Sequence, residues 1–386
     1  MKRIYLDYNA TAPLLPEALE AALPYYTASW GNASSIHRLG REARLAVEEA
    51  RDQVAQLLGV SNPLDLVFTG SGTEAVNLAL RGYALANQGH GRHLVTTRVE
   101  HPAVLDTCRA LQQDGFDVTY LPVDGQGCVD PVILAGSLRA DTLLVSVTYG
   151  NHEVGTLQPL AELIEAAHAR GIPVHVDAAQ AVGRVEVDVQ AWGIDLLSLS
   201  GHKFGGPKGI GALFIRDTLA GQMQAIIHGG HQERERRAGT EDVPSVVALG
   251  RACELIRPRL ADEGKRLGTL RDHLEREVLA RVSGARVLGR GSLRLPNTSN
   301  MSFPGVKGEA LVFNLDLLGI AVSTGASCTS RRGVPSQVLD AMGVSRAESE
   351  GSVRLSLGWA TTEDEIERVL QVLPAVVERL RRLSPM

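Results

Sequence analysis

The chain has 386 residues, and its 39 lysines and arginines against 44 aspartates and glutamates give a formal net charge of -5 with histidines neutral. This balance, without any block of like charge, disfavours nucleic acid or an anionic membrane as a partner. No apolar stretch is long enough to cross a bilayer and the N-terminal segment lacks the apolar core of a signal peptide, so the sequence predicts a cytoplasmic protein. The length predicts two domains rather than one compact core.

The first predicted elements are a strand-like run over residues 2–11, a helix over 17–26 and an amphipathic helix over 41–58 that ends before Gly59. A polar loop over residues 30–40 separates the two helices. Apolar segments separated mostly by helices or turns then predict a series of strands. They cover residues 64–70, 93–101, 116–124, 142–151, 172–180, 194–203 and 210–217. This alternation is typical of stacked βαβ units and therefore of a mainly parallel sheet.

The pattern changes after a glycine- and charge-rich loop over residues 228–244 and a helical region over 245–282 that contains Pro258. Shorter strands and helices follow and predict a smaller α+β unit. They cover residues 300–303, 308–318, 320–323, 335–342 and 353–357, before a last helix that Thr362 and Glu365 cap. We expect a large domain over 16–258, and a small domain made of 1–15 and 259–386.

Four cysteines are widely spaced along the chain: Cys108, Cys128, Cys253 and Cys328. They form no CxxC pair and no zinc-type group with histidine, so neither a disulfide framework nor a structural metal is expected. The histidine pairs at positions 90 and 93 and at 228 and 231 lie in glycine-rich stretches without an HExxH pattern. We therefore predict no metal site.

Polar residues with chemical use follow five of the predicted strands. They are residues 70–73, His101, Asn151 with His152, Asp177 with Gln180, and residues 200–203. Because ligands of open α/β sheets bind outside the carboxyl ends of the strands, five such endings predict one site at this edge.

Lys203 follows a buried apolar strand and stands beside His202 and Ser200. Such a lysine is suited to act as an amine nucleophile. The alternative is an ordinary solvated lysine on a loop.

The segment GSGTE, residues 70–74, begins a helix after a strand. Its exposed amides and the Thr73 hydroxyl are suited to bind a phosphate. The alternative is a plain capping box of Ser71 and Glu74. The spacing matches neither the Walker A motif nor the dinucleotide fingerprint, so a monophosphate is the better prediction.

Asp177 and His101 also follow strands and each has two interpretations. A buried aspartate needs a cationic partner, and a protonated pyridine nitrogen would serve, although a metal or a helix cap could occupy the same position. His101 precedes Pro102 and is suited either to stack on a flat cofactor and move protons or to cap a helix. A lysine amine, a phosphate cradle, a buried aspartate and a stacking histidine together predict pyridoxal 5'-phosphate, bound as a Schiff base to Lys203.

Several segments in order along residues 5–365 carry a resemblance to a known family. They are LDYNATAP, GNASSIHRLG, SGTEAVNLAL, VEHPAVLD, VDAAQAVG, SGHKFGGPKGIGAL, RAGTEDV, STGASCTS and SVRLSLG. This set resembles the cysteine desulfurases of the class V aminotransferase superfamily, in the branch that serves iron-sulfur assembly. The resemblance implies an α/β fold of the aspartate aminotransferase type (fold type I), with a mainly parallel seven-stranded sheet and a smaller α+β domain.

The resemblance also assigns roles to individual residues. Lys203 would hold the cofactor, Asp177 would face the pyridine nitrogen, Gln180 would face the phenolic oxygen, and His101 would stack on the ring and assist catalysis. The phosphate would be bound by Gly72, Thr73, Ser200 and His202, with Thr240 reaching from the second subunit of a homodimer. Arg354 would bind the substrate carboxylate, with Asn151 also at the substrate. The chain departs from the family at His152, where a second asparagine is usual near the phenolic oxygen.

Cys328 separates a desulfurase from the wider superfamily. It stands in a polar loop, TGASCTSRRG, where Arg331 and Arg332 favour the thiolate. The alternative is a buried, inert cysteine. The resemblance assigns Cys328 as the nucleophile that takes sulfur from L-cysteine, leaves L-alanine and passes the sulfur to an acceptor such as an iron-sulfur scaffold, with a transient cluster-ligand role left open. Alternatives are a selenocysteine lyase, another class V aminotransferase, or a sulfur-carrier scaffold without catalysis.

Overall fold

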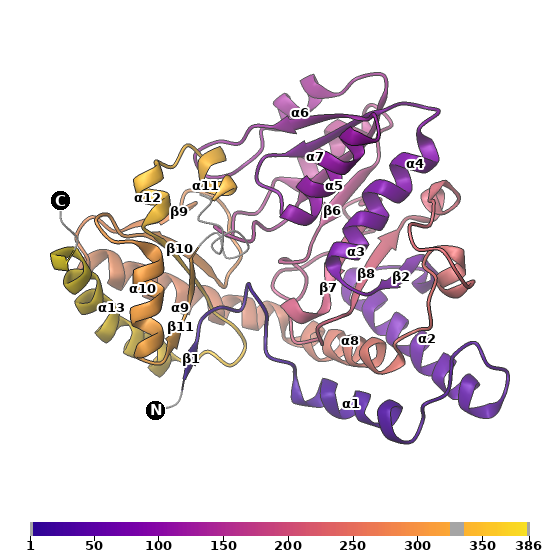
Figure 1. Cartoon of the computed structure of the whole chain (residues 1–386), viewed down its shortest axis with the longest axis horizontal. Coiled ribbons are helices and arrows are strands. Elements are labelled where there is room, and N and C mark those ends of the chain that lie inside the picture. The colour runs from indigo at the N-terminus through magenta and orange to yellow at the C-terminus, as the bar shows by residue number, and fades with distance from the viewer. Residues whose placement is uncertain (1–2, 325–335, 384–386) are drawn as a thin grey trace.

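The computed structural model of the chain describes residues 3–324 and 336–383. Figure 1 shows a larger part built around a broad sheet and a smaller part that combines the start of the chain with its C-terminal third. Within the described ranges, no helix combines the length and the apolar character that a membrane span requires.

The sheet of the larger part positions the site. Its strands are β2 (Leu66–Thr69), β3 (His93–Thr97), β4 (Asp117–Leu121), β5 (Thr142–Thr148), β6 (Val174–Asp177), β7 (Leu196–Ser200) and β8 (Gly211–Ile215). They lie in the order β2-β8-β7-β6-β5-β3-β4. Only β8 runs antiparallel to its neighbours in this sheet. The other strands therefore end at one common edge, which confirms the predicted mainly parallel seven-stranded sheet.

Helices cover both faces of this sheet. They are α1 (Pro16–Thr27), α2 (Arg38–Leu58), α3 (Gly72–Asn77), α4 (Tyr83–Asn87), α5 (Pro102–Gln113), α6 (Pro131–Ser137), α7 (Leu160–His168) and α8 (Val243–Ile256). Strand β5 is buried along its whole length. Two adjacent residues of this strand, Leu144 and Val145, belong to different apolar clusters. Side chains of a strand alternate between the two faces, so each face has its own layer of helices.

The smaller part has a separate core. Its elements are β1 (Ile4–Tyr5), α9 (Leu260–Arg281), β9 (Arg286–Leu288), β10 (Thr298–Ser302), α10 (Gly308–Leu317), β11 (Ile320–Ala321), β12 (Ser323–Thr324), α11 (Gln337–Ala341), α12 (Arg346–Glu350), β13 (Ser352–Ser356) and α13 (Glu363–Leu383). An antiparallel sheet has the order β12-β13-β10-β9, and β1 pairs in parallel with β11. Ile4 and Leu6 pack in one cluster with α9, α10 and α13. This cluster supports the predicted division into residues 16–258 against 1–15 and 259–386, which stays a prediction.

Two predicted elements differ from those observed. The predicted strand over 93–101 ends at Thr97, because Pro102 begins a helix and His101 caps it. The predicted helical region over 245–282 is divided into α8 and α9 by a 3-10 turn, Arg257–Arg259, since Pro258 cannot donate a backbone hydrogen bond. The predicted capping box of the last helix is confirmed: Glu365 N donates to Thr362 Oγ1 at 3.3 Å and Thr362 N donates to Glu365 Oε2 at 3.2 Å.

A buried histidine makes the stability of this sheet depend on pH. His175 lies on β6 between Ser146 Oγ, 2.8 Å away, and Ser198 Oγ, 3.2 Å away. Burial lowers the pKa of this imidazole to about 3. Between pH 6.5 and pH 3 the unfolded chain therefore binds a proton here that the native state does not bind, so this contribution to stability is lost as the pH falls.

We expect the His175→Gln variant to lose less stability than the wild type when the pH is lowered from 7 to 5, by about 2 kcal/mol. Denaturant unfolding at both pH values measures this difference. The exposed His90 provides the matched control, because His90→Gln should keep the wild-type dependence. Equal losses in the wild type and in His175→Gln would contradict the prediction.

Candidate active site

Lys203 lies at the end of the sheet, in a 3-10 turn (Gly201–Lys203) that directly follows β7. Its Nζ donates to the backbone oxygen of Asn9 at 2.6 Å and to that of Ala10 at 3.1 Å. The side chain is half-buried. These contacts contradict the alternative of a solvated loop lysine and place a primary amine between the sheet edge and the N-terminal segment.

Asp177 ends the neighbouring strand β6 and is buried. Its Oδ1 accepts a hydrogen bond from Ala179 N at 3.0 Å. Burial raises the pKa of this carboxyl group, while the backbone hydrogen bond and the charge of Lys203 lower it. A carboxylate in this environment is best stabilised by a cationic group beside it, as the predicted pairing with a pyridine nitrogen requires.

His101 and His152 form the next part of the site. His101 Nδ1 accepts from Ala103 N at 3.1 Å, which confirms the capping interpretation. Its ring also meets the His152 ring edge-on, with centroids 5.3 Å apart and an interplanar angle of 76°. Burial, with a smaller effect of the Lys203 charge, lowers the pKa of His101 to about 4, and burial lowers that of His152 well below its usual value. Both imidazoles are therefore neutral at pH 7. They do not repel the Lys203 ammonium group, and they do not compete with it for an anion.

The start of α3 contains the predicted phosphate-binding segment. Ser71 Oγ accepts from Glu74 N at 3.1 Å, so the serine caps the helix, whereas Glu74 Oε2 accepts from Gly70 N at 2.8 Å and not from Ser71 N as a full capping box requires. This cap leaves the amides of Gly72 and Thr73 without an intrahelical acceptor. Gly72 lies against Ser200, where a Cβ on residue 72 would come within 2.9 Å of the serine Cβ. The cap and an anion site are compatible, and the phosphate role stays a prediction.

Gln180 and His202 converge on the same N-terminal segment as Lys203. Gln180 Nε2 donates to Asn9 O at 2.9 Å, so one backbone oxygen accepts from both the amide and the lysine. His202 Nδ1 lies 3.1 Å from Thr11 Oγ1. Residues 9–11 therefore connect the groups that β6 and β7 bring to the edge.

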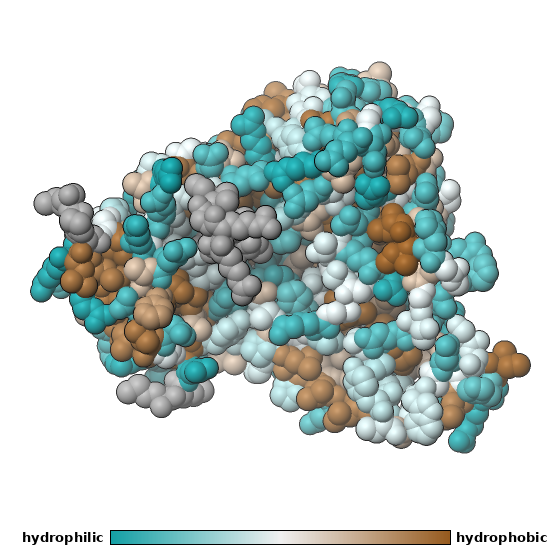
Figure 2. Space-filling view, in the orientation of Figure 1, coloured by the Kyte–Doolittle hydropathy of each residue, from teal (hydrophilic) through white to brown (hydrophobic). Residues whose placement is uncertain are grey.

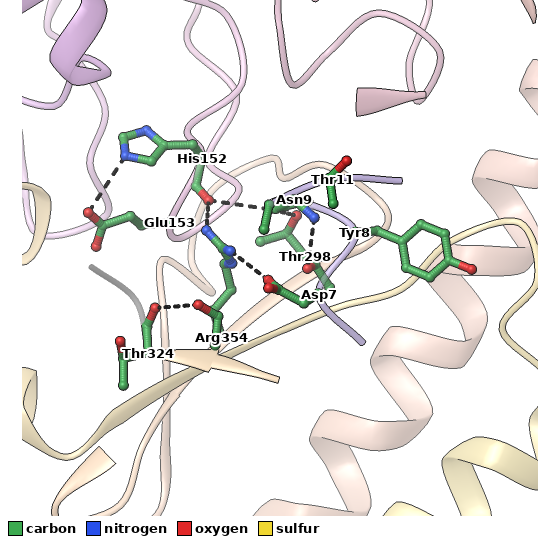
Figure 3. Close-up of polar contacts among 12 residues, drawn as sticks. Asp7, Tyr8, Asn9, Thr11, His152, Glu153, Thr298, Thr324 and Arg354 are labelled. Atoms are coloured by element: carbon green, nitrogen blue, oxygen red, sulfur yellow. Dashed lines mark hydrogen bonds and ion pairs between the residues drawn. The ribbon is translucent and has the colours of Figure 1, made fainter. Parts of the chain in front are cut away.

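Arg354 reaches the site from β13 of the smaller part, as Figure 3 shows. Its Nη1 donates to His152 O at 2.9 Å, and its Nη2 is 2.8 Å from Asp7 Oδ1. The Nε atom is buried without a partner among the described residues. A planar guanidinium whose Nε–H has no partner among the described residues is suited to bind a carboxylate. The substrate role of Arg354 stays a prediction.

Asn151 folds the loop that carries His152. Its Nδ2 donates to Val99 O at 2.9 Å, and its Oδ1 accepts from Glu153 N at 2.9 Å and from Val154 N at 3.0 Å. The bond to Val99 uses one of the two protons of the NH2 group. The contact of Asn151 with the substrate stays a prediction.

Two further residues that the sequence predicts for the site are Thr240 and Cys328. Thr240 is exposed on the loop before α8, as a residue that contacts a second copy would be. Cys328 lies outside the described residues. Of the cysteines inside them, burial raises the pKa of Cys108 to about 12 and also raises those of Cys253 and Cys128. These three thiols are therefore poor nucleophiles, in agreement with the structural role expected for them.

The assembled residues fit a phosphorylated aromatic aldehyde. An amine, a buried carboxyl group and a neutral imidazole surround one region, and a helix N-terminus with a glycine first residue borders it. These features match the covalent, electronic and phosphate contacts that pyridoxal phosphate requires.

Sequence reasoning missed the residues that hold this cluster together. Asn9 accepts from Lys203 and Gln180 through its backbone and donates to Thr298 Oγ1 at 2.9 Å through its side chain. Arg184 contacts the backbone of Lys203 and both the backbone and the side chain of Gln180. The only sequence signal for Asn9 was its place in LDYNATAP, a segment without strong periodicity.

Known proteins with similar sequences and structures share this architecture. The model of the family "Aminotransferase class-V" matches residues 4–369. A protein of Dictyoglomus turgidum named "Cysteine desulfurase IscS" is 46% identical over 386 residues, which are 100% of this chain and 97% of that protein. A solved structure titled "NIFS-LIKE PROTEIN" has a TM-score of 0.92 at 37% identity and covers 98% of this chain and 100% of its own. Another, titled "SspA in complex with cysteine", has a TM-score of 0.82 at 34% identity and covers 92% and 98%. The chain therefore belongs to the class-V aminotransferase family.

Proposed function

We propose that the protein is a cysteine desulfurase that uses pyridoxal phosphate to convert L-cysteine to L-alanine and to retain the sulfur as a persulfide. The observation that carries the proposal is the meeting of the Lys203 amine, the Asp177 carboxyl and the His101 imidazole at one sheet edge. The full-length similarity to a protein named cysteine desulfurase supports the same conclusion.

Pyridoxal phosphate, when bound, withdraws electrons from the α-carbon of an amino acid, so that bonds to that carbon can break. Lys203 would hold it covalently and, once displaced by the substrate amine, would move the α-proton. Asp177 would keep the pyridine nitrogen protonated, and His101 would lie on the ring. The remaining contacts would come from Gln180 and His152 at the phenolic oxygen and from Gly72, Thr73, Ser200, His202 and the Thr240 of a second copy at the phosphate.

The substrate carboxylate would bind to Arg354. Its guanidinium is buried and already carries two contacts, with Asp7 and with the backbone of His152. Its unpartnered Nε provides the next donor. The structure titled "SspA in complex with cysteine" is that of a similar protein, and supports free cysteine as the ligand of this site.

Cys328 is proposed as the sulfur acceptor. Its thiolate attacks the sulfur of the bound cysteine, an S–S bond forms, and the carbon–sulfur bond breaks with its electron pair remaining on the carbon fragment. That fragment takes up protons and leaves as L-alanine, while the enzyme sulfur becomes a persulfide. The transfer is redox-neutral, because the carbon gains the electrons that the two sulfurs lose. An acceptor protein, such as an iron-sulfur scaffold, would then take the terminal sulfur.

A homodimer is part of the proposal. The outer side of α1 exposes Leu19, Leu23 and Tyr26, and Trp30 follows it. Figure 2 shows apolar residues gathered over α1 on this face. A second copy that covers this surface would also have to bring Thr240 to the partner's phosphate site. A cytoplasmic location stays a prediction.

We expect the Cys328→Ser variant to bind the cofactor and L-cysteine but to release no sulfide. A hydroxyl group cannot take up sulfur as a persulfide, whereas the residues proposed above to hold the cofactor do not include residue 328. The measurement combines the visible spectrum with alanine and sulfide production under a thiol reductant. Cys128→Ser is the matched control and should retain wild-type turnover.

The outcome also separates the alternatives. Full alanine production by Cys328→Ser would refute the role of Cys328 as sulfur acceptor. A requirement for a keto acid, without alanine formation from L-cysteine, would indicate an aminotransferase and refute the desulfurase proposal. Faster turnover of selenocysteine than of cysteine would indicate a selenocysteine lyase. Protein that stays colourless with added pyridoxal phosphate would indicate a scaffold without catalysis.

A further inference from the structure

Arg184 is a buried arginine whose contacts differ from those of the buried Arg51 and Arg294. It is 7% exposed, and burial, with a smaller effect of the Arg354 charge, lowers its pKa to about 9. The buried Arg51 and Arg294 pair with Glu233 and Glu275 at 2.8 Å. Within residues 3–324 and 336–383, Arg184 has no such ion pair. Because a buried cation is costly to desolvate, the neutral groups that it binds must account for its position.

All of its acceptors belong to the cofactor site or to the segment beside it. Nη1 donates to Gln180 O at 2.8 Å and also to Gln180 Oε1. Nη2 donates to Tyr8 O at 3.1 Å and to Lys203 O at 3.1 Å. One planar guanidinium thus joins the glutamine, the lysine main chain and the N-terminal segment.

The contact with Oε1 determines the orientation of the Gln180 amide. An arginine has only donors, so the amide atom that faces it must be the oxygen. The NH2 group of Gln180 is thereby turned the other way, where it donates to Asn9 O at 2.9 Å. Lys203 Nζ donates to that same oxygen at 2.6 Å. The NH2 group of Gln180 therefore points toward the same backbone oxygen as the Lys203 amine.

We propose that Arg184 is a positioning residue of the cofactor site, which keeps the NH2 group of Gln180 directed toward the Lys203 amine and ties the Lys203 main chain to Tyr8. This inference rests on the proposed function, because the Gln180 donor matters only if the phenolic oxygen of a pyridoxal ring lies beside the amine. A guanidinium is suited to this role because its two NH2 groups can donate hydrogen bonds in different directions at the same time. A lysine at this position would retain the charge but not the geometry.

The test is the pH titration of the visible band of the holoenzyme, which reports the protonation of the nitrogen that joins Lys203 to the cofactor. A directed NH2 group stabilises the negative phenolic oxygen, and its loss makes that nitrogen easier to protonate. We expect the midpoint to rise by roughly half to one pH unit in Arg184→Met, as the loss of one neutral hydrogen bond implies. Arg184→Lys should raise it as well.

A double-mutant cycle separates positioning from charge. In a Gln180→Leu background, Arg184→Met should produce no further rise, because no amide is left to orient. An equal rise in both backgrounds would indicate a direct effect of the charge and overturn the inference, and so would an unchanged midpoint in the wild-type background. Arg294→Met, which removes a buried arginine that binds Glu275 and neither Gln180 nor Lys203 among the described residues, should reduce stability without moving the midpoint.

Folding and function are checked separately. If Arg184→Met does not fold, Arg184→Lys is used in the same cycle with the same outcomes. A wild-type protein without a visible band, or without desulfuration of L-cysteine, would refute the proposed function. A normal wild-type enzyme whose midpoint does not respond to residue 184 would refute only the role of Arg184.

Discussion

Replacing Lys203 with alanine should abolish covalent attachment of pyridoxal phosphate and lower desulfuration of L-cysteine by at least roughly 10³-fold. The amine serves both as the point of attachment and as the base for the α-proton, and either function alone contributes a large factor. The geometry supports this expectation, because the Lys203 side chain is half-buried and its Nζ lies 2.6 Å from Asn9 O.

Borohydride reduction followed by mass spectrometry measures the attachment directly. The wild type should retain the cofactor on the peptide that contains Lys203, and Lys203→Ala should retain none. Lys208 is a matched control in the same glycine-rich segment, since it is exposed and Lys208→Ala should behave as the wild type. A reduced adduct or wild-type alanine formation in Lys203→Ala would disprove the assignment.

Replacing Glu233 with alanine should destabilise the fold by about 3 to 5 kcal/mol, because it leaves the Arg51 guanidinium buried without its counter-charge. Both side chains are only 3% exposed, and two N–O contacts of 2.8 and 2.9 Å join them. Glu233 Oε2 also accepts from Phe68 N at 3.0 Å. The pair holds residues 233–235 at positive φ angles of 47°, 57° and 66°, a conformation that costs non-glycine residues of order 1 kcal/mol or more each.

Denaturant unfolding at pH 7 measures this loss. Glu235→Ala is the control within the same turn, since this side chain is 74% exposed and should change stability by less than about 0.5 kcal/mol. The double variant Arg51→Met with Glu233→Met should recover part of the loss, because no unpaired charge remains. A loss below about 1 kcal/mol in Glu233→Ala would show that the arginine finds another partner.

The sequence was sufficient to locate the sheet edge and most of the residues on it. Strands of a parallel sheet buried on both faces are continuous apolar runs, so the polar residues that end them are conspicuous. Lys203 and Asp177 were found in this way, and the structure places each at the end of its strand. His101 was assigned to the same edge, but its strand was predicted too long because the local pattern does not show where pairing with β4 stops.

The contacts that join distant segments could not be predicted. Asn9 and Arg184 bind largely through backbone oxygens, and a backbone acceptor has no residue type that a pattern could reveal. The loop-folding contacts of Asn151 were not predicted for a related reason: an amide at a strand end fits a ligand contact and a loop-folding contact equally well. The predicted role of Thr240 requires a second copy of the chain, so a single chain offers no contact from which to derive that role.

The path of residues 4–12 has a mechanical consequence. This segment starts as a strand of the smaller part, and its Asp7 contacts Arg354 (Figure 3). It then provides the carbonyl groups of Asn9 and Ala10 that hold the Lys203 amine. It therefore acts as a tether between the two parts of the molecule. Any hinge rotation that separates them must either stretch this tether or pull Asn9 away from Lys203. A rotation that separates the two parts would thus also disturb the contacts of the Lys203 amine.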